Sequence, residues 1–168
     1  EMLDAEGEFT QKNIQLVSKK ITTPLQQVVY TCKEGLNTYK TTFAVFGFQY
    51  VQVEADFPID PAAFTAIAVY SDLEQTGFFD CSHPLLNALY HATLWSAKGN
   101  HLDVPTDCPT RERHGWSGDA QIFCDTASYM FRFAPFAKKY LHDMYDWQDK
   151  RGCLPHIAPE GGADSYMR

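Results

Sequence analysis

The sequence predicts a mixed fold, in which antiparallel β structure over residues 1–76, forming part of a β-sandwich, is followed by an α-helical part over residues 77–168. Residues before position 76 are rich in β-branched and aromatic side chains that alternate in places with polar ones. Residues after it repeat apolar side chains at helical spacing. The chain has 168 residues, of which 45% are hydrophobic and 21% charged. This is globular composition, and the length suits one domain or two small ones.

The first part contains three predicted strands, at residues 25–32, 42–53 and 65–70. Within the second segment, residues 48–53 alternate apolar and polar side chains, which is typical of a half-buried strand. Gly47 interrupts this segment and indicates a bulge or a close backbone approach. Residues 4–7 predict a turn, and residues 57–61 predict a loop. Strands of this kind usually belong to a sandwich, but they are too few here to complete one.

The second part contains three predicted helices. The first follows Ser82 as N-cap, with Pro84 in its first turn, and ends at Gly99. The second covers residues 119–132 and is expected to bury Ile122, Phe123, Ala127 and Met130. The third starts at Pro135 and stops before Gly152 and Pro155. Its stripe of Phe136, Tyr140, Met144 and Trp147 favours a core face over a ligand site.

Charge and cysteine usage exclude several classes of function. The formal net charge is −7, without a basic stripe, so neither nucleic acid nor an anionic membrane is an expected partner. No apolar run approaches the ~20 residues that span a bilayer. The five cysteines are widely spaced and lack a CxxC pair, so we expect buried free thiols with no metal or other cofactor.

The start of the sequence leaves the compartment open. No signal peptide is visible, and the first residue is Glu1, with Met2 after it. A processed chain or a piece of a longer protein is therefore expected, in the cytoplasm or exported.

The segment of residues 100–118, between the first two helices, carries the candidate chemistry. Loops of this length inside a domain are usually functional or disordered. Three carboxylates, those of Asp107, Glu112 and Asp119, lie close in sequence to the indole of Trp116. Carboxylates accept hydrogen bonds from sugar hydroxyls, an aromatic ring packs on the apolar face of a sugar, and one acid can protonate a departing oxygen. The pattern therefore indicates a carbohydrate site.

Residues 107–120 read Asp-Cys-Pro-Thr-Arg-Glu-Arg-His-Gly-Trp-Ser-Gly-Asp-Ala, which closely resembles the signature of bacterial α-L-rhamnosidases of glycoside hydrolase family 78. The resemblance extends to residues 46–53, where Phe46 and Gln49 replace the usual His and Arg, and to residues 71–79 and 87–107. It implies that Glu112 is the general acid. It also implies that Asp107, Arg111, Trp116 and Asp119 bind rhamnose, so that the partner is a rhamnose-containing oligosaccharide or glycoside.

The catalytic domain of that family is an (α/α)6 barrel, which needs at least ~200 residues. Fewer than half that number follow position 76. The resemblance therefore implies a fragment that joins the end of a β-sandwich domain (residues 1–76) to the first helices of the barrel (residues 77–168). Its second catalytic carboxylate is not found in this sequence, so the isolated chain is expected to be inactive. An incomplete barrel would expose apolar helix faces, which predicts association with the rest of the parent chain or self-association.

Other interpretations stay open at this point. The chain could be a non-catalytic or degenerate carbohydrate-binding module, or part of a related barrel glycosidase with another sugar specificity. Asp107 could instead cap a turn, and Asp119 could simply favour a helix N-terminus. A Cys108–His114 nucleophilic pair, or a metal held by Cys108, His114 and Cys124, has no recognised spacing.

Overall fold

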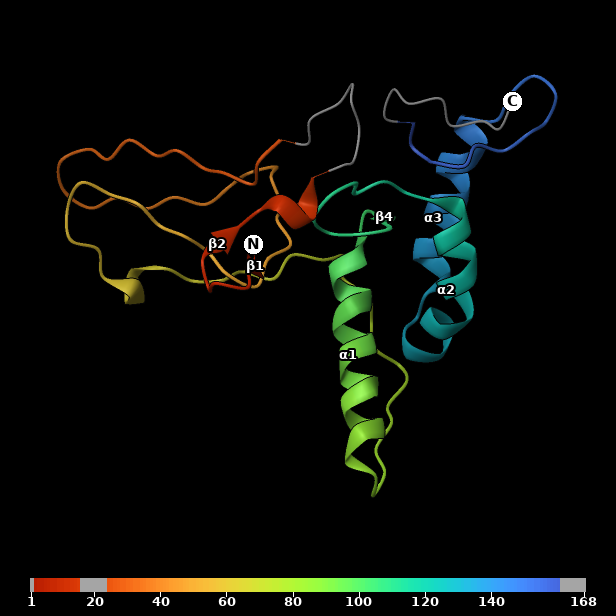
Figure 1. The fold of residues 1–168 in the computed structure, drawn as a ribbon. Helices are drawn as coiled ribbons and strands as arrows, with labels where there is room; N and C mark the ends of the chain where they lie inside the picture. Colours follow the sequence, from red (N-terminus) through yellow and green to blue (C-terminus); the bar gives the residue numbers. More distant parts are fainter. Residues whose placement is uncertain (1, 16–23, 161–168) are drawn as a thin grey trace. The chain divides into compact units, whose positions relative to one another are not determined.

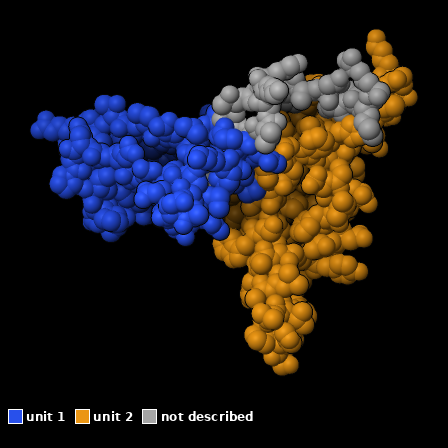
Figure 2. All heavy atoms as spheres, viewed as in Figure 1, with its two compact units in different colours: residues 1–67, 109–111 blue, residues 68–108, 112–168 orange. Residues whose placement is uncertain are grey.

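The computed structural model describes residues 2–15 and 24–160, which form two compact units (Figure 2). Unit 1 comprises residues 1–67 together with 109–111. Unit 2 comprises residues 68–108 and 112–168. The chain therefore leaves unit 2, enters unit 1 and returns within the loop that carries the candidate site. The domain boundary between residues 76 and 77 stays a prediction.

Unit 1 begins with a small antiparallel hairpin of β1 (Met2–Leu3) and β2 (Phe9–Thr10) (Figure 1). The predicted turn at residues 4–7 is confirmed. The Asp4 carboxylate accepts the backbone N–H groups of Glu6 and Glu8 at 3.1 and 2.8 Å, which is how a short Asx-type side chain stabilises a tight turn. Two single-turn 3-10 helices follow, Lys12–Ile14 and Pro61–Ala63.

The three strands predicted at residues 25–32, 42–53 and 65–70 are not formed in the structure. The alternation of residues 48–53 does not produce a half-buried face either, since all six residues are exposed. Alternation selects a buried face only when a neighbouring strand satisfies the backbone and a second layer covers the apolar side. These segments find neither within the described chain, so the prediction of strands is wrong here and the β-sandwich is not confirmed.

Unit 2 contains the three helices that the periodicity predicts: α1 (Pro84–Asn100), α2 (Ser117–Met130) and α3 (Ala134–Asp146) (Figure 1). A two-stranded hairpin of β3 (His101–Leu102) and β4 (Val104–Pro105) occupies the first part of the segment predicted as a loop over residues 100–118. We call the remaining residues 107–116, up to the start of α2, the candidate loop. The N-cap of α1 is His83, not Ser82. Its carbonyl accepts the N–H groups of Leu86 and Asn87 at 3.1 and 3.3 Å, and Pro84 takes the first helical position, where a missing N–H costs nothing.

The core of unit 2 lies where the three helices meet. Its buried members come from all three helices and their connections: Leu94, Ala97, Ala127, Met130, Phe131, Phe133 and Phe136. Tyr140, Met144 and Ala158 form a second cluster. The predicted stripe of α3 is therefore confirmed at Phe136, Tyr140 and Met144, whereas Trp147 lies just beyond the helix and is 39% exposed. On α2, Ile122 is 79% exposed, so its predicted burial is wrong.

His101 is the buried polar residue of this core. Its Nδ1 lies 2.7 Å from the carbonyl oxygen of Ala97, and a carbonyl can only accept, so Nδ1 carries the proton. Its ring packs against Phe123, Phe133 and Phe136 at centroid distances of 5.6, 5.5 and 5.1 Å. Burial lowers the pKa of His101, and the hydrogen bond to Ala97 opposes that shift only in part. The imidazole therefore serves as a neutral aromatic core residue.

The end of α2 is joined to the segment that precedes α1. The Met130 carbonyl accepts the N–H groups of Thr76 and Gly77 at 2.9 and 3.0 Å, and Gln75 forms a β-bridge with Phe131. A side chain on Gly77 would overlap the Tyr129 carbonyl. Only glycine allows the two backbones to approach this closely.

The cysteines are free, as predicted, but none is fully buried. Cys32 and Cys153 are exposed and the other three are intermediate. The expectation of buried thiols is therefore wrong. Two of the thiols accept backbone hydrogen bonds, Cys81 from the N–H of His83 and Cys108 from the N–H of Glu112. None of the helices in the described part of the chain combines the length and apolar character needed to span a bilayer.

Candidate active site

The base of the candidate loop is closed between Asp107 and His114. The N–H of Asp107 donates to the His114 carbonyl at 3.1 Å, and the N–H of His114 donates to Asp107 Oδ1 at 3.0 Å. This reciprocal pair joins residues seven positions apart. The bond shows a structural role for the Asp107 carboxylate, of the turn-stabilising kind that the sequence left open. A carboxylate has capacity for further hydrogen bonds, so this role does not conflict with sugar binding.

A second contact lies inside the loop, between Cys108 and Glu112. The N–H of Glu112 donates to Cys108 Sγ at 3.2 Å. The thiol thus acts as an acceptor that fixes the backbone of the predicted general acid. It is not paired with an imidazole for nucleophilic chemistry in any described contact.

The structure brings two of the predicted site residues, Glu112 and Trp116, into direct contact. Trp116 Nε1 donates to Glu112 Oε2 at 3.1 Å, and both side chains are partly buried. The indole N–H is a donor only, so the bond orients the carboxylate and the ring together. The result is an acid next to an aromatic surface, the pairing expected of a sugar site.

The far side of the loop is held by two elements that come later in the chain. The Gly115 carbonyl accepts the hydroxyl of Tyr140, from α3, at 2.7 Å and the N–H of Ala158 at 3.0 Å. Trp116 forms an antiparallel β-bridge with Ile157. A Cβ on residue 115 would overlap the Ala158 carbonyl, so glycine is required by the close approach. We call residues 156–158 the latch.

Asp119 lies on the first turn of α2 and is exposed. A carboxylate at this position is favoured by the helix dipole. It is also close enough to Tyr140 to act on that hydroxyl. Burial, followed by the charges of Asp143 and Asp119, raises the pKa of Tyr140 to about 12. The hydroxyl therefore stays protonated and keeps donating to Gly115.

Arg111 is exposed and groups with Pro109 and Thr110, the part of the loop that belongs to unit 1. Residues 109–111 form the tip of the loop. The predicted contact of Arg111 with substrate stays a prediction.

No three His, Cys, Asp or Glu side chains gather closely enough to hold a metal ion in residues 2–15 and 24–160.

Sequence reasoning missed three features that shape the loop: Tyr140 and the latch, which hold it from outside, and the thiol of Cys108, which lies within it. Tyr140 was predicted as a core residue only, and its core position is correct. The signal available for its second role is chemical, because a buried tyrosine hydroxyl needs a partner. The latch follows no local pattern.

The model of the bacterial α-L-rhamnosidase six-hairpin glycosidase domain matches residues 74–167. The three helices of unit 2 fit a domain built of helical hairpins. An α-L-rhamnosidase of Streptomyces avermitilis is 39% identical over 137 residues, which are 79% of this chain and 13% of the relative. One of Formosa agariphila is 30% identical over 164 residues, which are 95% of this chain and 17% of the relative.

Among solved structures, the S. avermitilis α-L-rhamnosidase in complex with L-rhamnose is similar with a TM-score of 0.54 and 39% identity. The similarity covers 55% of this chain and 9% of that chain. The chain thus spans 13–17% of the length of these two curated relatives.

Proposed function

The chain belongs to the family of bacterial α-L-rhamnosidase six-hairpin glycosidase domains. From this premise we propose that it supplies the general acid of an active site that removes terminal α-L-rhamnose from glycans or glycosides. The relatives are named α-L-rhamnosidases, which are glycoside hydrolases, and one was solved with L-rhamnose. Because the chain covers a small part of their length, activity and substrate are assigned here to the complete natural protein.

The observation that carries the proposal is the 3.1 Å hydrogen bond between Trp116 Nε1 and Glu112 Oε2. A six-deoxy sugar has an apolar edge at its methyl group, and an indole ring offers an apolar surface of matching size. A ring stacked there would bring its glycosidic oxygen near the acid that the same indole orients. Binding and proton transfer would then depend on one rigid pair.

In the proposed reaction, Glu112 donates a proton to the glycosidic oxygen while water attacks the anomeric carbon from the opposite face, with inversion. The carboxylate that activates this water comes from outside the present chain, at the separation of ~6.5–9.5 Å that inversion requires. Asp107, Asp119 and Arg111 bind sugar hydroxyls. The second carboxylate oxygen of Asp107 suits this role, since Oδ1 already accepts His114 N–H.

Glu112→Gln in the complete natural protein tests the acid. On a rhamnosyl disaccharide, whose leaving group must be protonated, kcat is expected to fall by roughly 10²–10⁴. On 4-nitrophenyl α-L-rhamnoside, whose leaving group departs without help, the fall is expected to be much smaller. Glu74→Gln is the matched control, because Glu74 is a surface carboxylate that pairs with Arg132 at 2.9 Å. An equal fall on both substrates, or none, would reject Glu112 as the acid.

Two further readouts separate the proposed reaction from its alternatives. Nuclear magnetic resonance of the first-formed sugar reports the stereochemistry, and initial release of α-rhamnose would contradict inversion. Calorimetric binding of L-rhamnose by a wild-type protein that hydrolyses neither substrate would identify a carbohydrate-binding module instead of an enzyme.

A further inference from the structure

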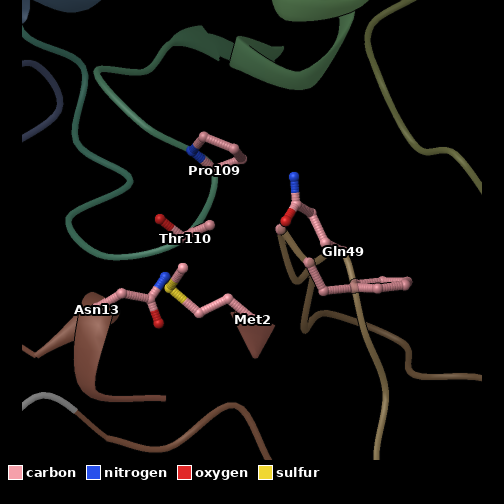
Figure 3. A pocket seen from close by; sticks show the side chains of 7 residues that line it. Met2, Asn13, Gln49, Pro109 and Thr110 are labelled. Atoms are coloured by element: carbon pink, nitrogen blue, oxygen red, sulfur yellow. The ribbon is translucent and has the colours of Figure 1, made fainter. Parts of the chain in front are cut away.

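The tip of the candidate loop is held within unit 1. The N–H of Gly47 donates to the Pro109 carbonyl at 3.1 Å, and a Cβ on residue 47 would lie 2.7 Å from Thr110 Cγ2 and 3.1 Å from the backbone carbon of Pro109. The prediction that Gly47 marks a close backbone approach is thus confirmed. Figure 3 shows Pro109 and Thr110 facing Met2 and Asn13 across a shallow hollow that belongs to unit 1. The predicted acid, in contrast, lies in unit 2 together with the latch.

The backbone on both sides of Trp116 is fixed by later elements of unit 2. On its N-terminal side, the Gly115 carbonyl accepts the Tyr140 hydroxyl at 2.7 Å and an N–H of the latch at 3.0 Å. On its C-terminal side, the N–H of Ser117 donates to the His156 carbonyl at 2.8 Å. The indole of Trp116 therefore projects from a backbone that these hydrogen bonds hold in place.

Residue 115 is closely surrounded by the same elements. Gly115 is buried, and a Cβ at this position would overlap the Ala158 carbonyl and lie 3.3 Å from Cε2 of Tyr140. The Tyr140 ring is itself buried in the second core cluster, with Met144 and Ala158. The hydroxyl that bonds Gly115 therefore belongs to a closely packed part of the core.

We propose that Gly115 and Tyr140 are positioning residues for the general acid of the proposed reaction and that they act through Trp116. The peptide that joins Gly115 to Trp116 is the one whose carbonyl the Tyr140 hydroxyl bonds. The indole of Trp116 in turn donates to Glu112 Oε2 at 3.1 Å. A shift of this peptide would therefore move the indole, and with it the carboxyl group that protonates the glycosidic oxygen. This inference rests on the proposed function, because the role it assigns runs through Glu112.

Two substrates separate positioning from a general loss of structure. A rhamnosyl disaccharide and 4-nitrophenyl α-L-rhamnoside present the same rhamnosyl ring, so a change in stacking on Trp116 would alter KM for both by the same factor. Only the disaccharide needs a proton at its leaving oxygen, so a misplaced acid lowers kcat chiefly on that substrate. A variant that merely unfolds in part would lose kcat equally on both.

Gly115→Ala in the complete natural protein tests the inference. The added methyl would displace the peptide before Trp116 from the latch, and misplacing an acid by about 1 Å costs roughly 10²-fold in rate. On the disaccharide, kcat is expected to fall by roughly 10- to 100-fold, and on 4-nitrophenyl α-L-rhamnoside by less than about 3-fold. Gly99→Ala is the matched control, because a Cβ at residue 99 would have nothing within 4 Å, and its kcat should be unchanged on both substrates.

Tyr140→Phe tests the same role with a smaller change, since it removes the hydroxyl donor and keeps the ring. Its kcat on the disaccharide is expected to fall by roughly 2- to 5-fold, with the same dependence on substrate. Tyr145→Phe is the control, because Tyr145 lies on the same helix and is exposed. Should Gly115→Ala fail to fold, the Tyr140→Phe result decides. Equal losses on both substrates, or no loss in either variant, would overturn the positioning role.

The double variant Gly115→Ala/Glu112→Gln separates failure of this inference from failure of the proposed function. If Gly115 acts through Glu112, its substitution adds no further loss of kcat on the disaccharide once the acid is gone. A full additional loss would overturn the inference while leaving the acid in place. If Glu112→Gln alone shows no dependence on the leaving group, the proposed function fails first, and the positioning role fails with it.

Discussion

Replacing Tyr140 by Phe isolates one hydrogen bond that holds the candidate loop. The Tyr140 hydroxyl is buried, with the residue 5% exposed, and donates to the Gly115 carbonyl at 2.7 Å. The substitution removes one oxygen and leaves the ring in the second core cluster, so no large cavity results. The change therefore reports the bond and little else.

The size of the expected loss in free energy depends on the hydrogen bonds that the Gly115 carbonyl keeps after the substitution. A neutral buried hydrogen bond contributes about 0.5–1.5 kcal/mol net, and more is lost only when its partner is left unsatisfied. The Gly115 carbonyl still accepts the N–H of Ala158 at 3.0 Å, so it is not left unsatisfied. We therefore expect the free energy needed to open the loop from the latch to fall by about 1 kcal/mol. This corresponds to an opening equilibrium constant, and hence an exchange rate of the protected amides, that is about five-fold larger.

Hydrogen–deuterium exchange of the complete natural protein measures this opening directly. The reporters are the amides of Ser117 and Ala158, which donate to the His156 and Gly115 carbonyls at 2.8 and 3.0 Å. Tyr145→Phe is the control, because Tyr145 lies on the same helix and is 60% exposed. Unchanged exchange at both amides in Tyr140→Phe, or an equal change in the control, would refute the reasoning.

Three further predictions concern titration and close packing. The pKa of Tyr140 is raised to about 12 from an ordinary 10.0, so the folded state keeps the phenolic proton to higher pH than the unfolded state does. The stability gained from this difference is complete below pH 10 and is lost as the pH rises toward 12. The near-ultraviolet phenolate titration of Tyr140→Phe should therefore lack a step near pH 12, and loss of a step near pH 10 instead would contradict this. The pKa of His101 is lowered in the folded state, so the unfolded chain binds the proton more readily and stability should fall as the pH drops below 6.5. The midpoint of thermal unfolding of His101→Phe should therefore depend less on pH below 6.5. An equally steep pH dependence in this variant would count against the buried neutral imidazole. Gly77→Ala should lower the free energy of unfolding, measured in urea, by about 1–3 kcal/mol, because the added Cβ overlaps the Tyr129 carbonyl. Gly99→Ala should change it by less than about 1 kcal/mol in either direction. Similar urea midpoints for the two variants would refute the close approach at Gly77.

The helices could be predicted because their signals are local. Each helix buries residues three or four apart, and Phe136, Tyr140 and Met144 all lie on the buried face of α3. Ile122 shows the limit of that signal. The spacing of Ile122 from the other apolar residues suits a helix, but which face of α2 is buried depends on the element that packs against that helix. The local sequence does not identify that element.

The β part could not be predicted, since a strand is defined by its partner. Phe43 and Val29 have the side chains of a strand core, yet they are 96% and 85% exposed. Propensity for β structure describes a side chain that fits a half-buried sheet, and it has no effect where no ladder forms.

The candidate loop lies between these cases. Its residues were found because Glu112 and Trp116 are near in sequence, and the bond between them is a local contact. The contacts that hold the loop from outside, through Tyr140, Gly47 and Ala158, join positions far apart in the chain. Only the folded chain brings such positions together.

The latch has a consequence for the time at which the loop acquires its shape. During synthesis, α1 and α2 can form as soon as they leave the ribosome, because helical contacts are local. Residues 107–116 must wait until Ile157 emerges and can pair with Trp116. Some forty residues of translation therefore pass before the loop can take its final shape. A pause within that stretch would expose the open loop to chaperones and proteases.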